Sequence, residues 1–269
     1  MTLPPSSLDA LAADYAERTW LDVRPRHHAG PGDARHITHG LAAAGWTRRS
    51  DPLGPHLVLQ SPDHRFGLEM STGISSGGLW WWLCEHPTAT NGWWAEFGDT
   101  PVEILGHVTD ALVLDPPPPE RCPSPLNTLA EAGWAVTAKD AVSPERCCHF
   151  ARTTAMWSVR TYGAPSRHAP LVWHATLHPR TPQHVLAALA AGLADTAPLH
   201  RSTWDRTGLP SLRPEPSTLT ATQIIGAHKD RVHALGTRWA DSRSRAGVAP
   251  PPATSRSTSA RAPRVAHAG

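Results

Sequence analysis

The apolar positions of the chain recur in two successive stretches with the same order of patterns. In the first stretch, helical spacing at 37–44 is followed by strand-like alternation at 56–60, 65–70, 79–84 and 93–97, and then by a second helical stripe after Thr100. In the shorter second stretch, a helix, two strands and a helix are predicted over residues 126–132, 156–162, 171–177 and the positions after Thr181. Helical spacing predicts a helix with one buried side, and alternation predicts a strand with one buried face.

Tryptophans mark the same positions in both stretches. The corresponding pairs are Trp46 and Trp134, Trp81 and Trp157, and Trp93 and Trp173. A pattern that recurs along a chain indicates a repeated structural unit, and the large aromatic side chains that both copies share are expected to build its core. We therefore expect an α+β fold with two tandem repeats, each an antiparallel β-meander sheet packed by a C-terminal α-helix.

The predicted helix starts carry capping signals. Thr100 precedes Pro101, and Glu103 stands three residues after Thr100. A threonine at the N-cap and a glutamate three residues later satisfy backbone N–H groups reciprocally, and proline is favoured in the first turn. We expect Thr100 and Glu103 to form a capping box, Thr181 to cap the equivalent helix, and Gly45 to end the helix before it in a left-handed conformation.

Further segments flank the two predicted repeats. Residues 6–20 and 218–241 have apolar positions at helical spacing, residues 195–216 are irregular, and the chain from Ser242 has no apolar periodicity, which predicts disorder. The predicted organisation is an N-terminal helix (1–19), a first repeat (20–114), a Pro-rich linker (115–124), a second repeat (125–197), an irregular segment with a C-terminal helix (198–241) and a disordered basic tail (242–269).

Composition places the chain among ordinary globular proteins. The 269 residues are 40% hydrophobic and 18% charged, with a net charge of +2, which suits about two domains. No apolar run reaches the length of a membrane span, and the N-terminus lacks a basic region followed by an apolar core. The 4 cysteines show no disulfide-scaffold spacing. We expect a cytoplasmic protein with reduced thiols and no membrane contact.

Three tryptophans of the first stretch have no counterpart in the second. Successive side chains of a strand point to opposite faces, so Trp80 and Trp82 share the face opposite Trp81, and Trp94 opposes Trp93. If Trp81 and Trp93 face a helix, the other three form an aromatic patch on the far face. Such a patch indicates a partner surface, a contact between the repeats or between two copies of the chain, or a platform on which bases stack.

Catalytic and metal-binding motifs are sparse. Residues 147–149 (Cys-Cys-His), with Cys122 upstream, suggest zinc, but adjacent cysteines point to opposite sides of a strand and structural zinc sites favour cysteines separated by about two to four residues. The chain contains no Gly-x-x-x-x-Gly-Lys phosphate loop. Asp63, in the turn at 61–64, is the candidate acid, although a turn aspartate usually bonds to its own backbone. We expect no catalytic residue, no metal and no cofactor.

Basic residues gather before the first repeat and in the tail. Arg24 and Arg26 lie in the segment 23–33, and the tail holds arginines and no acidic residue after Asp241. A basic disordered tail adds affinity for nucleic acid. In that alternative, Arg24, Arg26 and the tail contact phosphates while the three unmatched tryptophans stack on bases.

Four motifs of the first stretch resemble one family. They are Ser-Pro-Asp-His before a strand, Trp-Trp in the next strand, Trp-x-Ala-x-Phe at 93–97 and Thr-Pro-Val-Glu-Ile at 100–104. They resemble the SPDY-motif domain of unknown function, found largely in Streptomyces and related actinomycetes, often as tandem copies. The segment at 25–33 (Pro-Arg-His-x-Ala-Gly-x-Gly-Asp) is similar to the lead-in of that family.

The resemblance spans about residues 20–197 and differs between the two copies. In the second copy Glu145 stands in place of the motif aspartate, and one tryptophan of the Trp-Trp pair remains. The resemblance implies a fold and a tandem arrangement but no established activity.

Together these patterns favour a binding role. We expect a non-enzymatic cytoplasmic protein-interaction module that binds an unknown protein or a second copy of itself; the alternative is an accessory nucleic-acid-binding protein. The candidate binding residues are Trp80, Trp82, Trp94, Asp63, Arg24 and Arg26.

Overall fold

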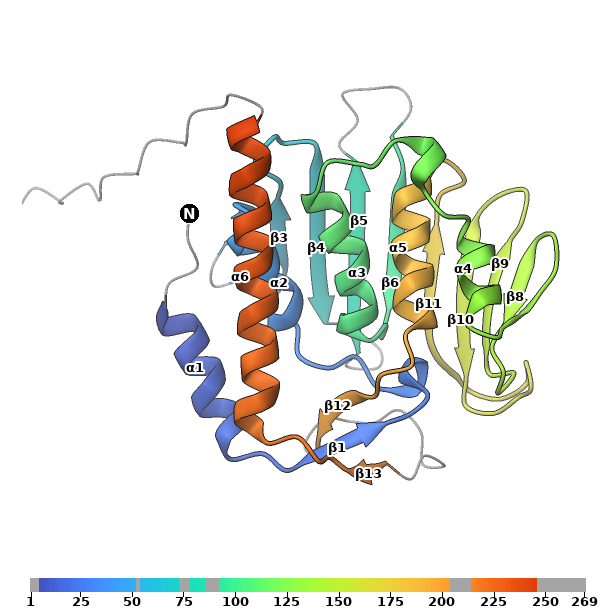
Figure 1. The fold of residues 1–269 in the computed structure, drawn as a ribbon, viewed down its shortest axis with the longest axis horizontal. Coiled ribbons are helices and arrows are strands. Elements are labelled where there is room, and N and C mark those ends of the chain that lie inside the picture. Colours follow the sequence, from blue (N-terminus) through green and yellow to red (C-terminus); the bar gives the residue numbers. More distant parts are fainter. Residues whose placement is uncertain (1–4, 52–53, 73–77, 86–91, 204–213, 246–269) are drawn as a thin grey trace, which may run out of the picture.

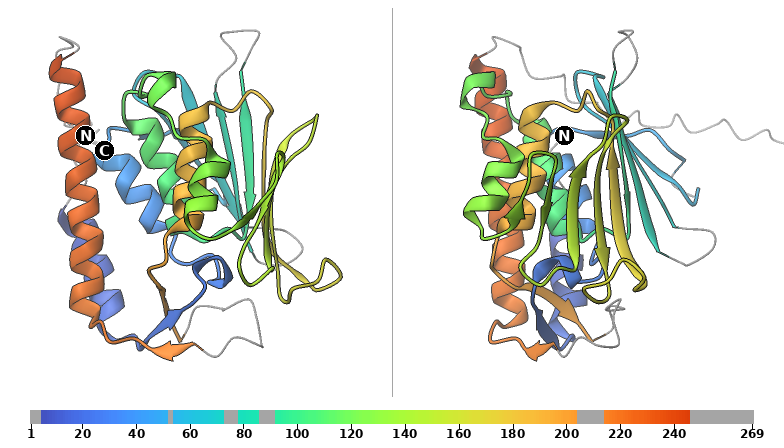
Figure 2. Two further views of the ribbon diagram at one scale, coloured as in Figure 1. Left: turned by 45° about the vertical axis from the view of Figure 1, so that its right-hand side comes forward. Right: turned by 90° about the vertical axis from the view of Figure 1, so that its right-hand side faces the viewer.

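Strands from both predicted repeats form a single antiparallel sheet. The structure, a computed structural model, describes residues 5–51, 54–72, 78–85, 92–203 and 214–245. The 10 strands are ordered β2-β3-β4-β5-β6-β11-β10-β9-β8-β7. Helices cover one face, and no helix of the described ranges covers the other (Figures 1 and 2). The sequence predicts a sheet for each repeat, whereas the structure joins the two sets of strands edge to edge through β6 and β11.

Each half of the sheet is preceded and followed by a helix. The elements of the first half are α2 (Arg35–Ala43), β2 (Thr47–Arg48), β3 (Leu57–Gln60), β4 (Phe66–Thr72), β5 (Leu79–Glu85), β6 (Trp94–Gly98) and α3 (Val102–Val113). Those of the second half are α4 (Pro125–Glu131), β7 (Ala135–Val136), β8 (Asp140–Val142), β9 (Cys148–Arg152), β10 (Trp157–Tyr162), β11 (Leu171–Leu177) and α5 (Gln183–Ala194). The strands β2, β7, β8 and β9 are too short or too mixed to be recognised from alternation. The outermost strands, β2 and β7, are the shortest, which limits the edge available for further pairing.

One row of side chains on the helix-covered face crosses the junction between the halves. Phe97 lies opposite Trp81 on one side and opposite Ala175 on the other. The row continues in both directions through Met70, Val159, Phe150 and Ala141. Except for Met70, which is half-buried and packs against them, these residues belong to the same cluster of buried side chains as residues of α3 and α5. The two halves therefore share one hydrophobic core.

The order of helices and strands that recurs in the two halves includes matching helix ends. Gly45 and Gly133 have φ of +80° and +83°, so the left-handed conformation predicted at Gly45 is confirmed and recurs after α4. In both places the next residue, Trp46 or Trp134, donates its backbone N–H to a leucine carbonyl of the helix. This turn buries each tryptophan against the sheet.

The chain termini build a second layer around the helices. Helix α1 (Pro5–Ala16) and helix α6 (Ala221–Arg245) pack on each other, and α6 lies outside α2 and α3 (Figure 2). A 3-stranded sheet has the order β12-β1-β13, with β1 at Trp20–Val23, β12 at Leu199–Ser202 and β13 at Glu215–Pro216. Short 3-10 helices occur at Arg26–His28 (η1) and Pro119–Arg121 (η2).

Three predictions for these terminal segments are wrong. The N-terminal helix ends at Ala16 instead of Trp20, and the segment predicted to be irregular contains β12, because β1 and β12 pair although they lie far apart in the sequence. The residues from Ser242 to Arg245, predicted to be disordered, continue α6. The rest of the predicted tail, 246–269, lies outside the described residues.

A buried ion pair joins β12 to the helix layer. Arg201 is 1% exposed, and its Nη1 and Nη2 donate to the two carboxylate oxygens of Glu103 on α3 at 2.8 and 2.7 Å. Its Nε and Nη2 also donate to the carbonyl oxygen of Gly30 at 3.0 and 2.8 Å. Burial alone would raise the pKa of Glu103, but the Arg201 guanidinium overrides burial and lowers this pKa to about 2. Both groups therefore remain charged.

The predicted capping box of Thr100 and Glu103 and the predicted cap at Thr181 are wrong. Helix α3 starts after Pro101 and has no side-chain cap. Thr100 instead donates to the carbonyl oxygen of His174 at 3.1 Å, and Arg201 engages the Glu103 carboxylate. Thr181 likewise donates to the carbonyl oxygen of His178 at 2.8 Å and caps no helix. Tertiary contacts thus engage the side chains of Thr100 and Glu103, and a local turn engages that of Thr181.

We expect that removing one member of the buried pair destabilises the whole fold. In Arg201→Met the Glu103 carboxylate stays largely buried without its partner, which should lower the free energy of unfolding by about 3–5 kcal/mol. Urea unfolding followed by tryptophan fluorescence measures this. Arg160→Met, which replaces an exposed arginine of β10, is the control and should change stability by less than about 0.5 kcal/mol. Equal stability of the two variants would contradict the role given to Arg201.

Candidate functional site

Three tryptophans form a stacked strip on the sheet face away from the helices. We call Trp80, Trp82 and Trp94 the aromatic strip; each is half-buried, whereas Trp81 and Trp93 are buried on the helix-covered face. The ring centroids of Trp80 and Trp82 are 6.0 Å apart at 23°, and those of Trp82 and Trp94 are 5.0 Å apart at 12°. The strip runs along β5 and across to β6.

The strip lies near the middle of the ten-stranded sheet. Strand β6, which carries Trp94, pairs with β5 on one side and with β11 on the other. Glu69 on β4 and Glu96 on β6 are the register neighbours of Trp82. The Nε1 of Trp80 donates to Glu96 Oε1 at 2.9 Å. The strip therefore presents indole edges beside two carboxylates.

One glycine allows a histidine to lie against the sheet beside the strip. His174 on β11 approaches Glu96 Oε1 to 3.6 Å with its Nε2. A Cβ atom at Gly98 would come within 2.5 Å of the His174 ring. Only glycine at this position leaves room for the imidazole next to the strip.

Arg24 and Arg26 do not join the aromatic strip. Both line a cavity at the ends of α4 and α5. Arg24 is exposed, but Arg26 is 7% exposed, forms an ion pair with Asp195 and donates to the carbonyl oxygen of Gly192 at 3.3 Å. Arg26 is therefore fixed at the end of α5 and does not offer its charge to a ligand on the surface.

Asp63 lies in a tight turn between β3 and β4. Its Oδ1 accepts hydrogen bonds from the Ser61 hydroxyl at 2.6 Å and the Arg65 backbone N–H at 3.1 Å. His64 in the same turn has a φ of +59°. The second half has the equivalent turn before β9, with Arg146 at a φ of +62°. In this position Asp63 orders its own turn.

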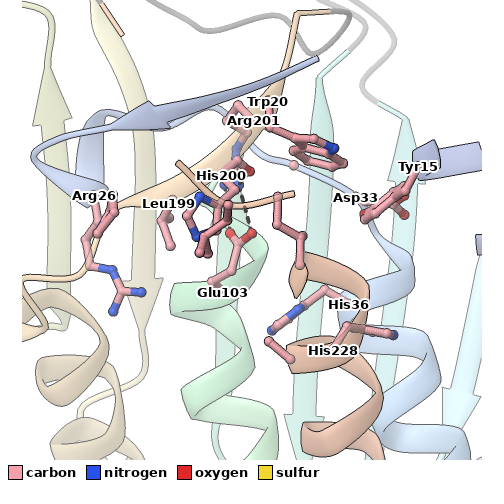
Figure 3. A pocket seen from close by; sticks show the side chains of 15 residues that line it. Tyr15, Trp20, Arg26, Asp33, His36, Glu103, Leu199, His200, Arg201 and His228 are labelled. Carbon is pink, nitrogen blue, oxygen red and sulfur yellow. Dashed lines mark hydrogen bonds and ion pairs between the residues drawn. The ribbon is translucent and has the colours of Figure 1, made fainter. Parts of the chain in front are cut away.

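A cavity of about 240 Å³ lies where the terminal elements meet the helix layer (Figure 3). Residues of α1, β1, α2, α3, β12 and α6 line it, including Tyr15, Asp33, His36 and His228, with the Arg201–Glu103 pair at one side. Sequence reasoning missed this cavity because its walls come from segments widely separated along the chain. Three residues of the lead-in motif at 25–33, namely Arg26, Gly32 and Asp33, line it.

The charged groups of this cavity are already paired with one another. The Tyr15 hydroxyl donates to Asp33 Oδ2 at 3.2 Å, and Arg35 Nη2 lies 2.7 Å from the same oxygen. Burial, reinforced by the Asp33 carboxylate, raises the pKa of Tyr15. No serine, threonine, cysteine or lysine is among the described lining residues. The cavity thus holds paired charges and no side-chain nucleophile of these types.

Two histidines of this cavity, His36 and His228, are uncharged at neutral pH. Burial, with a further contribution from Arg231, lowers the pKa of His36 to about 3. Burial and the neighbouring His39 lower the pKa of His228 to about 4. The Nε2 of His228 lies 3.1 Å from Nδ1 of His39, which connects α6 to α2. The His228 imidazole thus acts as a neutral hydrogen-bonding group between the two helices.

Among the described residues, the other candidates for catalysis or metal binding do not lie together in a site. Burial raises the pKa of Cys148 to about 12, and the described ranges contain no group of three His, Cys, Asp or Glu side chains placed to hold a metal ion. A Gly-x-Ser-x-Gly sequence at 73–77 lies outside the described residues; it follows β4 and precedes β5, whereas a nucleophile elbow joins a strand to a helix. Among the described residues, no helix combines the length and hydropathy needed to span a membrane.

We expect stability to fall as the pH drops below about 6.5. The unfolded chain takes up a proton at each histidine near pH 6.5, but the folded chain takes one up at His36 only near pH 3, so the unfolded state binds more protons between these values. At pH 5 this difference should remove about 2 kcal/mol for His36. Urea unfolding at pH 7.5 and pH 5 should show a smaller loss in His36→Asn than in the parent chain, with His168→Asn, at an exposed histidine, as control. An unchanged loss in His36→Asn would contradict the assignment.

Comparison with known proteins supports a family relationship for part of the chain. Residues 60–119 match the family described as "SPDY: Domain of unknown function (DUF317)". The match begins at the end of β3, includes the turn with Asp63 and the whole aromatic strip, and ends beyond α3. Searches of curated proteins and of solved structures gave no match. The aromatic strip thus lies in the segment of the chain that is similar to the SPDY domain of unknown function.

Proposed function

We propose that the protein is a non-enzymatic interaction module that binds a partner protein on the uncovered face of its ten-stranded sheet. The observation that carries this proposal is the aromatic strip. Trp80, Trp82 and Trp94 lie together near the middle of that face, and none of the described helices covers them. Large aromatic side chains are enriched at protein interfaces and dominate their binding energy.

The geometry of the strip favours a protein over nucleic acid. The rings of Trp82 and Trp94 are nearly parallel and close, so each ring already covers one face of its neighbour. Bases stack on open ring faces, and most faces within the strip are occupied. The indole edges remain for contact with apolar side chains of a partner.

The charges around the strip point in the same direction. Glu69 and Glu96 flank Trp82 on the same face of the sheet, and their carboxylates would repel phosphates. Arg26, one of the cations that the nucleic-acid alternative requires, is buried and paired with Asp195. In the nucleic-acid alternative, the exposed Arg24 is therefore still available to contact a phosphate, whereas Arg26 is not.

We include in this proposal that the two halves are tandem copies of one domain. Across the junction, Ala95 lies opposite Leu177 and Phe97 lies opposite Ala175, which is the exchange expected if β6 and β11 are equivalent strands related by a two-fold axis. Trp157 also lies opposite Leu177 as Trp81 lies opposite Phe97. By this equivalence the second copy has Met156, Ser158 and His174 in place of Trp80, Trp82 and Trp94.

The same proposal places the protein in the cytoplasm. The cysteines of the chain are free, and two of them, Cys147 and Cys148, are buried. Free thiols are typical of reducing compartments.

The two copies have different roles in this proposal. The first copy supplies the binding surface, and the second copy completes the sheet and the core.

Replacing two tryptophans of the strip should abolish capture of the partner without unfolding the protein. Tagged parent protein and Trp82→Ser/Trp94→Ser are used to pull down partners from a lysate of the encoding organism, treated with nuclease. We expect one protein to be retained by the parent and reduced at least about tenfold for the variant, since truncation of central aromatic residues costs about 2 kcal/mol or more each.

The matched control is Tyr162→Ser, which removes a half-buried aromatic residue from the same face outside the strip. It should retain the partner. Circular dichroism verifies that each variant is folded. Equal retention by parent and strip variant, or retention that disappears with nuclease treatment, would contradict the proposal, and the second result would favour nucleic acid.

A further inference from the structure

The lead-in motif before α2 encloses a second cavity that the aromatic strip does not explain. This cavity has a volume of about 340 Å³ and lies between the segment 24–27, the ends of α4 and α5, and the turn before β9. Its apolar wall includes Trp134 and Leu193. Segments that are widely separated along the chain therefore meet around one space.

Two nearly buried side chains of this cavity have nitrogen atoms without partners. Arg26 uses its Nη1 to bind Asp195 and the Gly192 carbonyl oxygen, but its buried Nε donates to no atom of the described residues. His27 is 3% exposed, and its buried Nε2 also lacks a hydrogen bond. Buried polar groups are nearly always hydrogen-bonded, so both atoms indicate a missing ligand or solvent partner.

The rim of the cavity carries one cation and one anion that are not paired with each other. Arg24 is exposed and forms no hydrogen bond or ion pair within the part of the chain that is described. The Glu145 carboxylate lies 3.8 Å from His27 Nε2. Burial, together with His28, lowers the pKa of His27 to about 3, so this imidazole is uncharged at neutral pH and does not neutralise Glu145.

Charge matching selects the kind of ligand. An anion alone would satisfy Arg24 but would face Glu145 and the Asp195 carboxylate that is already paired with Arg26, and a cation alone would face Arg24. A small molecule with a carboxylate and an ammonium group satisfies both, because each of its charges meets an opposite one in a partly desolvated site. The apolar wall at Trp134 and Leu193 leaves room for an uncharged remainder.

We propose that this cavity binds a free amino acid. Its carboxylate accepts hydrogen bonds from Arg24, and its ammonium group donates to the Glu145 carboxylate beside His27. Glu145 stands where the first half has Asp63, which bonds within its own turn. The departure of the second half from the Ser-Pro-Asp-His motif thus frees a carboxylate for a ligand.

Titration calorimetry with the full chain tests this inference. Each of the standard free L-amino acids is titrated at pH 7.5, and every one that binds is repeated as its N-acetyl derivative and as its carboxamide. We expect at least one free amino acid to bind and both blocked forms to bind at least tenfold more weakly, because each lacks one charge. Binding of no amino acid, or equal binding of free and blocked forms, would overturn the proposal.

Variants assign the two charges to the two residues. Arg24→Gln should weaken binding of the free amino acid at least tenfold and leave the weaker binding of its carboxamide unchanged. Glu145→Gln should do the same for the free acid and leave the N-acetyl derivative unchanged. Arg160→Gln, at an exposed arginine of the sheet, is the control and should bind like the parent. Equal effects of all three variants would overturn the proposal; the aromatic strip is untouched in each, so this result does not bear on partner binding.

Discussion

Strands β6 and β11 pair antiparallel, and this pairing determines how the rest of the molecule is arranged. Separately, each half of the sheet would end in a strand with unpaired backbone N–H and C=O groups, which is a site for association with other chains. Their pairing satisfies both edges at once and leaves only β2 and β7 as outer strands. It also places Phe97 beside Ala175, so that the apolar rows of the two halves become one row under the helices.

The same pairing explains why one face of the sheet stays uncovered. Helices α3 and α5 follow β6 and β11 directly and pack on each other over the junction. Both therefore lie on the same side, and α6 adds a further layer outside α2 and α3 (Figure 2). The opposite side is left with the alternate residues of the strands. Near its middle these residues are the half-buried tryptophans of the aromatic strip.

The sequence was sufficient for features that depend on local periodicity. Alternation along β5 assigns Trp81 to one face and Trp80 with Trp82 to the other, because a strand has no other way to orient successive side chains. The helices α2, α3, α4 and α5 were predicted within a few residues. The left-handed turn at Gly45 follows from the conformational freedom of glycine and needs no tertiary contact.

Features that depend on distant partners could not be predicted in this way. The central buried residue of β12 is Arg201, which reads as a surface residue until Glu103 is known to face it. The capping box failed because the same Glu103 bonds across the fold instead of along its helix. The sequence pattern also does not indicate that the two sheets join, because an edge strand and a central strand show the same alternation of apolar and polar residues. The cavity with Glu145 and Arg24 could not be predicted either, because its walls come from segments that are far apart in the sequence.

Oxidation of individual tryptophans by hydroxyl radicals, read by mass spectrometry, tests the central claim most directly. In the isolated protein, Trp80, Trp82 and Trp94 should be oxidised faster than the buried Trp81 and Trp93, and partner binding should slow oxidation of the strip alone. Protection of the strip equal to that of Trp81 in the isolated protein, or oxidation of the strip unchanged by the partner, would contradict the claim that this face of the sheet is the binding surface.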